Sequence, residues 1–354
     1  FAVLNTNDFK QGFERIVRDN SSYYVLGYYP TNSRRDGRFR KIEVRVTNPR
    51  LQVRARKGYV APTGRAAPTT STEAKEGTSP ILRDVLHSPL PQGGLTLTVF
   101  AAPFKGSAPN SLVTVAVLID GKDLSFKEKE GRFENTIELS MMALDQQGKM
   151  RGGERHTVKM ELKPETRARV NGAGFRLMSH LEIPHGRYQL RIAAREALGG
   201  RVGSVYYDLE VPDFTKAPLV MSGLAITSAA ANLVPTADPK AELNQLPITP
   251  TTEREFQVGD TLTVFGEVYD NIGLPTSAIV EVTTQLRADD GRIVFQSRDE
   301  RSTSELPGGR GGYVHTTTIP LKEASPGLYV LRLEARHRAK GLTVAREVQL
   351  KVRA

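Results

Sequence analysis

Two phrases of this sequence occur twice, in the same order. LTLTVFAAPF (95–104) returns as DTLTVFGEVYD (260–270), and GRYQLRIAARE (186–196) returns as GLYVLRLEARH (327–337). Within each phrase apolar and polar residues tend to alternate, which is typical of a strand with one buried face. Paired phrases at a constant order indicate an internal repeat. The sequence therefore predicts two copies of one β-sandwich module.

The residues around these phrases are also strand-like, with turns rich in Gly, Pro or Asp between them. In the first copy the expected strands are 95–102, 112–119, 133–139, 156–162, 175–183, 188–195 and 202–211. About seven short strands favour an immunoglobulin-like or fibronectin-like sandwich. We expect the first sandwich over 80–213, after a helical turn or two, and the second over 254–354. Residues 214–253 connect them, and the strand at 218–228 belongs either to this connection or to the second sandwich.

Tyr188 and Tyr329 occupy the same place in the shared pattern Gly-x-Tyr-x-Leu-Arg. Alternation predicts that each tyrosine points inward in a late strand of its own sandwich. The residues expected inward with them are Leu190 and Ile192 in the first copy and Leu331 and Leu333 in the second. Both tyrosines are thus predicted to be structural. The alternative is that Gly-x-Tyr marks an ordinary hairpin at each place and that the likeness of the two phrases is due to chance.

Most of the positive charge lies in the first segment of the chain. The net charge is +10, and residues 1–61 hold 13 Lys+Arg against 5 Asp+Glu. Residues 41–46 and 51–56 alternate, which predicts two paired strands with the basic side chains on their wet face. The alternative is a weak polyanion contact. Its residues are Arg34, Arg35, Arg38, Arg40, Lys41, Arg45, Arg54, Arg56 and Lys57.

The opening segment has a helix pattern over 9–19, the apolar run YYVLGYYP and then a linker over 62–79. NTNDFKQGFERIVRDNSSYYVLGYYPTN and DGRFRKIEVRVTNPRLQVRARKGYVAP resemble the closing part of bacterial VWFA-related proteins, which are exported and contain a von Willebrand factor type A-like domain. TTEREFQVGDTLTVFGEVYDN is similar to their C-terminal sandwich region. The resemblance implies that residues 1–61 are the terminal helix and strands of an α/β domain. It also implies that the metal site of that domain, for a divalent cation such as Mg²⁺, lies upstream of Phe1.

The chain itself shows no arrangement of residues that predicts catalysis. It has no cysteine, and its six histidines lack the spacing of a metalloprotease helix. Gly148-Lys149 and Asp289-Asp290-Gly291 are predicted to be hairpin turns, and PGGRGG (307–312) precedes no helix that could bind phosphate. We expect no catalytic residue, no metal ligand and no cofactor within these residues, and hence a protein that is not an enzyme.

Mainly β structure and the resemblance together predict a non-enzymatic, exported binding or adhesion-type protein. Its partner would be an unknown protein or extracellular ligand, with no specific nucleic acid, and its location periplasmic, cell-surface or secreted. No apolar run reaches the length of a membrane span. One alternative is a polyanion-binding module that uses residues 34–57. The other is a carbohydrate-binding accessory region, against which stand the absence of tryptophan and the concentration of tyrosines in the first segment.

Overall fold

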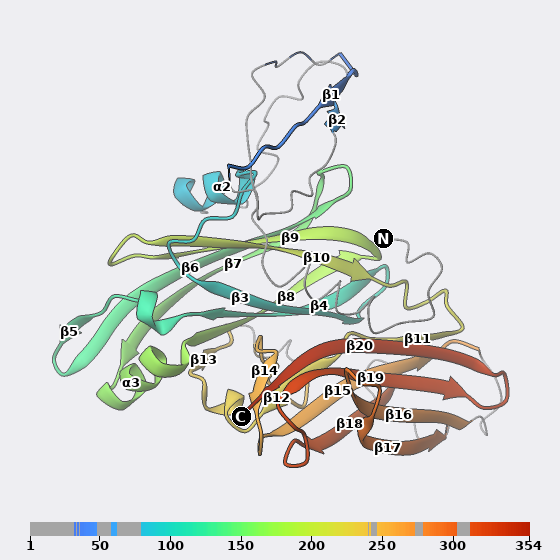
Figure 1. Cartoon of the computed structure of the whole chain (residues 1–354). Coiled ribbons are helices and arrows are strands. Elements are labelled where there is room, and N and C mark those ends of the chain that lie inside the picture. Colours follow the sequence, from blue (N-terminus) through green and yellow to red (C-terminus); the bar gives the residue numbers. More distant parts are fainter. Residues whose placement is uncertain are drawn as a thin grey trace. The chain divides into compact units, whose positions relative to one another are not determined.

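The protein is mainly β in the computed structural model, which describes residues 32, 34, 36–47, 58–61, 79–239, 241, 246–272, 279–302 and 312–354. The described residues form two compact units, one within 79–354 and the other within 32–61. The first contains two β-sandwiches, whose strands are labelled in Figure 1. The predictions for the helix at 9–19, the run YYVLGYYP and nearly all of the linker lie outside the described residues.

In the first sandwich, a four-stranded sheet packs against a five-stranded sheet. The first sheet, in the order β13-β8-β4-β3, contains β3 (Leu97–Lys105), β4 (Asn110–Ile119), β8 (Phe175–Pro184) and the short β13 (Thr236–Ala237). The second has the order β10-β9-β6-β5, with β7 also paired to β6. Its strands are β5 (Lys127–Lys129), β6 (Arg132–Asp145), β7 (Met150–Leu162), β9 (Gly186–Glu196) and β10 (Val202–Val211). Val115 and Val117 of one sheet and Leu190 and Ile192 of the other share one buried core.

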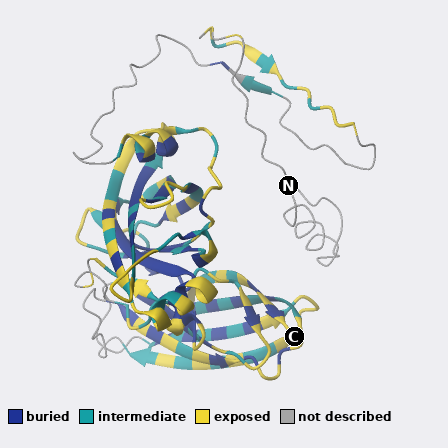
Figure 2. Ribbon diagram, turned by 90° about the vertical axis from the view of Figure 1, so that its left-hand side faces the viewer, coloured by how far each residue is buried: buried dark blue, intermediate teal, exposed yellow. Residues whose placement is uncertain are grey.

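The second sandwich repeats this arrangement. One sheet contains β11 (Leu219–Met221), β12 (Ala225–Ser228), β15 (Thr261–Asp270) and β18 (Tyr313–Pro320). The other, in the order β14-β20-β19-β16-β17, contains β14 (Glu255–Gln257), β16 (Ile279–Ala288), β17 (Ile293–Ser302), β19 (Gly327–His337) and β20 (Leu342–Arg353). The segment at 218–228 therefore pairs with the second sandwich through β11 and β12. Figure 2 shows buried residues along the strands of both sandwiches.

The two copies agree in topology. In the first, β6, β7, β8, β9 and β10 follow one another, and β9 pairs with both β6 and β10. In the second, β16, β17, β18, β19 and β20 follow in the same order, and β19 pairs with both β16 and β20. The phrases that contain Tyr188 and Tyr329 thus lie in equivalent strands.

The other repeated phrase lies on strands that are not equivalent in the two copies, which corrects the sequence prediction. LTLTVFAAPF lies on β3, which among the described strands pairs only with β4. DTLTVFGEVYD lies on β15, which pairs with β18 as β4 pairs with β8. By pairing, the counterpart of β15 is therefore β4. The phrase matches a strand with an alternating face, and such a pattern does not specify the strand's place in the sheet.

Two α-helices are described. α2 (Pro80–His87) begins at Ser79, whose side chain accepts a hydrogen bond from the Leu82 backbone nitrogen. Its buried residues pack on the outer face of β6 and β9, which confirms the expected helical turns. α3 (Pro164–Ala173) was not predicted, because Val170 is its only buried residue and no apolar stripe marks it. The short 3₁₀ helices are η1 (Gly121–Asp123) and η2 (Ala231–Leu233).

The smaller unit contains a short antiparallel pair, β1 (Phe39–Lys41) with β2 (Gly58–Val60). The strand expected over 41–46 is therefore wrong in extent. Ile42 and Val44 are half-buried and Glu43 and Arg45 are exposed, as the alternation predicts, but Val46 is exposed as well and residues 42–46 form no strand. Alternation orders the side chains, yet a strand also needs a paired backbone, and the expected partner at 51–56 lies outside the described residues.

A shared apolar cluster joins the two sandwiches within the larger unit. Phe100, Phe104 and Met178 of the first pack with Ala225 and Phe265 of the second, and all five are buried. The rings of Phe104 and Phe265 are 6.0 Å apart between centroids. β3 and β4 are consequently buried on both faces, one against their own core and the other against the second sandwich.

Backbone hydrogen bonds reinforce this joint. The Lys105 backbone nitrogen donates to the Tyr269 hydroxyl at 3.1 Å, and the Gly223 nitrogen donates to the Pro103 carbonyl at 2.8 Å. A Cβ atom on Gly223 would lie 2.6 Å from the Ala102 Cβ, so this close approach requires glycine. In addition, β13 of the connecting segment extends a sheet of the first sandwich by pairing in parallel with β8.

Candidate functional site

Tyr188 and Tyr329 form the same structural feature in the two copies. The Tyr188 hydroxyl donates to the Pro184 carbonyl at 2.8 Å, and the Tyr329 hydroxyl donates to the Ser325 carbonyl at 2.7 Å. Each bond reaches back four residues from near the start of the strand, as in the tyrosine corner of immunoglobulin-like sandwiches. Both tyrosines are buried, and burial raises the pKa of both hydroxyls. The alternation places them inward, so their outward neighbours carry the accessible chemistry.

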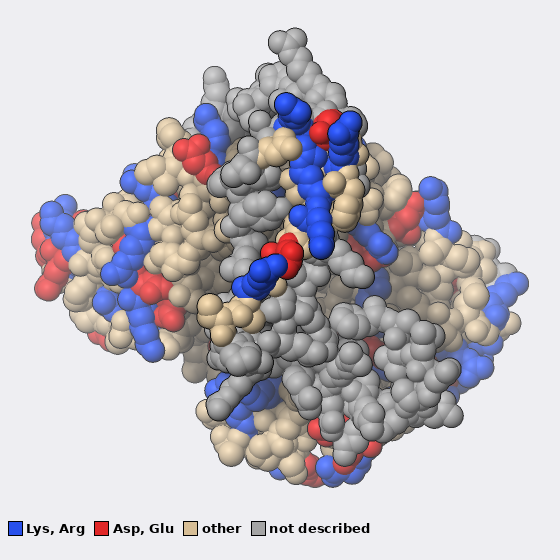
Figure 3. Space-filling view, turned by 45° about the horizontal axis from the view of Figure 1, so that its top comes forward, with Lys and Arg blue, Asp and Glu red and all other residues tan. Residues whose placement is uncertain are grey.

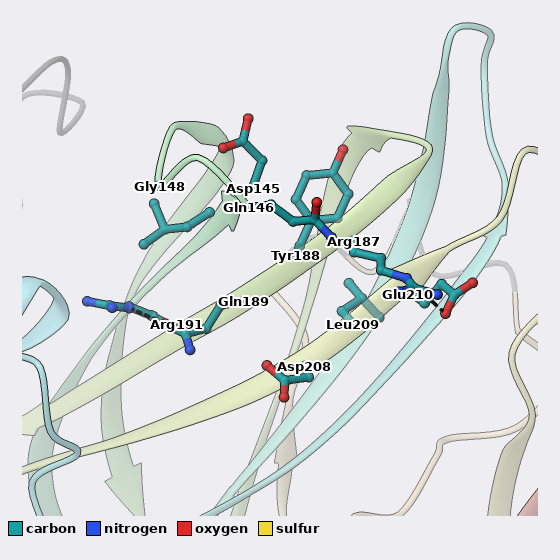
Figure 4. Close-up of a pocket in the computed structure, with 11 residues that line it drawn as sticks. Asp145, Gln146, Gly148, Arg187, Tyr188, Gln189, Arg191, Asp208, Leu209 and Glu210 are labelled. Atoms are coloured by element: carbon teal, nitrogen blue, oxygen red, sulfur yellow. Dashed lines mark hydrogen bonds and ion pairs between the residues drawn. The ribbon is translucent and has the colours of Figure 1, made fainter. Parts of the chain in front are cut away.

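A groove lies on that outward side of the first sandwich, beside the turn between β6 and β7 (Figure 4). Its volume is about 610 Å³, and a second hollow of about 410 Å³ adjoins it. The two hollows share Asp145, Gln146, Arg187 and Tyr188. The larger one is also lined by Leu144, Gly148, Gln189, Arg191, Asp208, Leu209 and Glu210.

The turn that forms one wall is held by Asp145. Its carboxylate accepts from the backbone nitrogens of Gln147 and Lys149, at 3.0 and 2.9 Å, and from Arg151 Nε at 2.7 Å. The bond from Arg151 is the main cause that lowers the pKa of Asp145. Gly148 has a φ of 76°, which favours glycine and confirms the predicted hairpin turn. The wall is therefore fixed by the turn itself.

The floor is formed by outward side chains of β9 and β10. Arg191 donates to Gln189 Oε1 at 2.8 Å and to the Leu86 carbonyl at 2.9 Å, and its guanidinium lies 4.7 Å from the centre of the Tyr206 ring. This arginine is therefore held in place by the end of α2. Asp208 lies opposite Gln189 in the strand register and is exposed.

The groove is polar but carries no excess of charge. Arg187 pairs with Glu210 at 3.6 Å, and both side chains are exposed. Across the two hollows, three carboxylates of Asp and Glu face three arginines. Among the described residues no three His, Cys, Asp or Glu side chains form a metal-binding group. The sequence pattern does not reveal this site, because outward positions of a strand are expected to be polar anyway.

The basic residues proposed for polyanion contact fall into two groups. Arg35, Arg54, Arg56 and Lys57 lie outside the described residues. Arg34, Arg38, Arg40, Lys41 and Arg45 are described.

Two of these five have acidic partners in their own segment. Arg40 forms an ion pair with Asp36 at 3.0 Å, and Arg45 forms one with Glu43 at 2.7 Å. The bond from Arg40 lowers the pKa of Asp36. On the face drawn in Figure 3, acidic residues also accompany many of the basic ones. The described part of the segment is thus a mixed surface.

Several histidines make contacts inside the sandwiches. His156 Nε2 lies 2.6 Å from Ser179 Oγ, and His315 Nε2 lies 2.9 Å from Thr284 Oγ1. Each bond crosses between two strands of one core. The turn at Asp289-Asp290-Gly291 joins β16 to β17, with a φ of 87° at Gly291, which confirms the predicted hairpin.

Neither a protein-family model nor a curated protein matches this sequence. Among solved structures, the chain is similar to a β-glucuronidase of Bacteroides uniformis, with 13% identity, 68% of this chain and 26% of that chain covered, and a TM-score of 0.27. It is also similar to a putative β-galactosidase from Bacteroides fragilis, with 14% identity, 73% of this chain and 41% of that chain covered, and a TM-score of 0.25. A third similar structure is latent PorU from Porphyromonas gingivalis, with 12% identity, 84% of this chain and 22% of that chain covered, and a TM-score of 0.27. The chain spans less than half of each of these proteins, and likeness at this level carries no argument about function.

No helix among the described residues is long and apolar enough to cross a membrane.

Proposed function

We propose that this chain is part of an exported, non-enzymatic binding protein, in which the two sandwiches act together as one rigid support and a secondary contact surface. The resemblance of residues 1–62 to VWFA-related proteins supports the first part of the proposal. By that resemblance, an A-type domain upstream would hold a protein or other extracellular ligand through a divalent cation. The sandwiches would position that domain.

The joint between the sandwiches is the observation that carries the support role. Sandwich modules linked by a flexible segment move independently, whereas a buried apolar interface restricts them. Here buried Phe104 and Phe265 occupy a common cluster, and Tyr269 binds the backbone of the first sandwich. The connecting segment also returns to the first sandwich as β13 before it enters the second. Bending at this joint would expose the apolar cluster to water, at a free-energy cost that grows with the area exposed.

Distance measurements between two spin labels test this role. The chain has no cysteine, so labels can be placed at Lys159→Cys on β7 and Thr343→Cys on β20, two exposed positions of different sandwiches. A rigid support predicts one narrow distance distribution. Gly223→Val, which would force the close backbone approach apart, should broaden it. A broad distribution in the protein without the Gly223 change would refute the support role.

The polyanion alternative is less favoured by the described residues. Arg40 and Arg45 are neutralised within their own segment, so the remaining attraction is that of scattered exposed charges.

The carbohydrate alternative has a specific observation in its favour, which is the groove on the first sandwich.

A further inference from the structure

We propose that the groove on the outer face of β9 and β10 binds a neutral, hydroxyl-rich chain, that is, a segment of an uncharged oligosaccharide. This proposal is independent of the resemblance to VWFA-related proteins. It rests on the comparison of the two sandwich copies and on the chemistry of the lining side chains.

The second sandwich shows which residues the fold itself requires at these positions. In the first copy Arg187 faces Glu210 and Gln189 faces Asp208 across the strand pair. In the second copy the equivalent pairs are Leu328 with Lys351 and Val330 with Gln349. The inward Tyr-x-Leu pattern is common to both copies, whereas the outward residues differ. A module of this topology therefore forms without the polar pairs, and they are available for a role other than folding.

Charge and hydrogen-bonding capacity indicate the class of ligand. The equal numbers of carboxylates and arginines exclude a strong preference for a polyanion or a polycation. The Asp208 carboxylate is exposed and has no ion-pair or hydrogen-bond partner among the described residues, so it can accept from a ligand. The amide of Gln146 both donates and accepts. Hydroxyl groups also do both, which matches this set of side chains.

A peptide is a poorer match to the same surface. β9, which carries Arg187, Gln189 and Arg191, is paired along both edges by β6 and β10, so an added strand could pair only with the outer edge of β10 and not across the groove floor. The lining side chains are mostly polar, so an apolar helix face would bury few partners. Tyr206 carries the Arg191 guanidinium on its ring, and the Tyr188 hydroxyl is bound to Pro184. Hydrogen bonds along several sugar units would therefore provide the affinity, with little contribution from ring stacking.

The test is calorimetric titration of the whole chain with a panel of neutral hexasaccharides of glucose, mannose, xylose, galactose and N-acetylglucosamine. A heparin-derived hexasaccharide is the charged comparison. We expect at least one neutral member to bind and Asp208→Ala to weaken it by about tenfold or more. Gln349→Ala changes the equivalent position of the second sandwich and is the matched control, for which we expect no change. Because Asp208 is exposed, its replacement should leave folding intact, and a thermal melt checks this.

Three results would overturn the proposal. One is that no neutral hexasaccharide binds. Another is binding that Asp208→Ala and Gln349→Ala affect equally, which would place the ligand elsewhere. The third is preferential binding of the heparin fragment that strengthens in Asp208→Ala, which would make the groove an anion site. Failure of the groove test leaves the spin-label result unaffected, so the two proposals fail separately.

Discussion

Replacing Tyr188 with Phe removes one hydroxyl from the first sandwich and leaves the buried ring in place. The lost bond runs 2.8 Å to the Pro184 carbonyl, and such a bond contributes about 0.5–1.5 kcal/mol to the free energy of unfolding. Tyr188→Ala also removes the packed ring, and aromatic truncations in a core cost about 3–5 kcal/mol. We therefore expect Tyr188→Phe to be mildly destabilising and Tyr188→Ala to unfold the first sandwich well below its normal melting temperature.

Hydrogen exchange measured by mass spectrometry resolves this effect by sandwich. In Tyr188→Phe, exchange should rise moderately over β6, β9 and β10, while β16 and β19 stay protected. In Tyr188→Ala the first sandwich should lose protection, and β15 should lose part of its protection too, because Phe265 would lose its partners in the joint. Tyr329→Phe is the matched change in the other copy and should reverse the pattern. Equal loss in both sandwiches from either Phe variant would refute the view of two modules with separate cores.

Three further outcomes are expected. Burial lowers the pKa of His315 from its ordinary 6.5, so the unfolded chain takes up this proton at a higher pH than the folded chain. The contribution of this group to stability should therefore be full above about pH 6.5 and should fall as the pH drops below it. The urea midpoint of His315→Gln should fall less over the same pH range. Gly148→Val places a branched side chain at a φ of 76°, which should lower the free energy of unfolding by about 1–2 kcal/mol and shift the urea midpoint down accordingly. Gly172→Val, at an ordinary φ, should lower the free energy of unfolding less. Heparin retention should be weak and should be lost as the salt concentration rises, before it reaches roughly 0.5 M, because salt screens exposed charges. Retention above that concentration would show a specific polyanion site instead.

Local patterns were enough to predict much of each sandwich. The alternation in GRYQLRIAARE placed Tyr188, Leu190 and Ile192 on one face, and the structure buries all three. The same holds for Tyr329, Leu331 and Leu333. These predictions succeed because a strand's period of two is set by its backbone, and burial then selects the apolar face.

Features that depend on distant residues were not predicted. Phe100 to Phe104 are buried without a break, because the second sandwich covers a face that would otherwise be exposed. The apolar run VFAAPF was a local sign of this, yet its partner Phe265 lies far along the chain, and no pattern within the run identifies it. The order of strands was mistaken for a related reason, since DTLTVFGEVYD specifies a strand but not its neighbours.

The groove was missed because the sequence describes its residues only as outward. Gln189 and Asp208 lie on different strands and meet through the register of β9 and β10. Their significance follows from comparison with Val330 and Gln349, which became possible once the equivalent strands were known.

The rigid joint is the central claim, and residual dipolar couplings of the whole chain in a weakly aligning medium test it most directly. Two bodies fixed to each other tumble and align as one. The couplings of residues in β6, β9 and β10 and those in β16, β19 and β20 should therefore fit a single alignment tensor. Two tensors of different size for the two sandwiches would mean that they move independently, and would contradict the account.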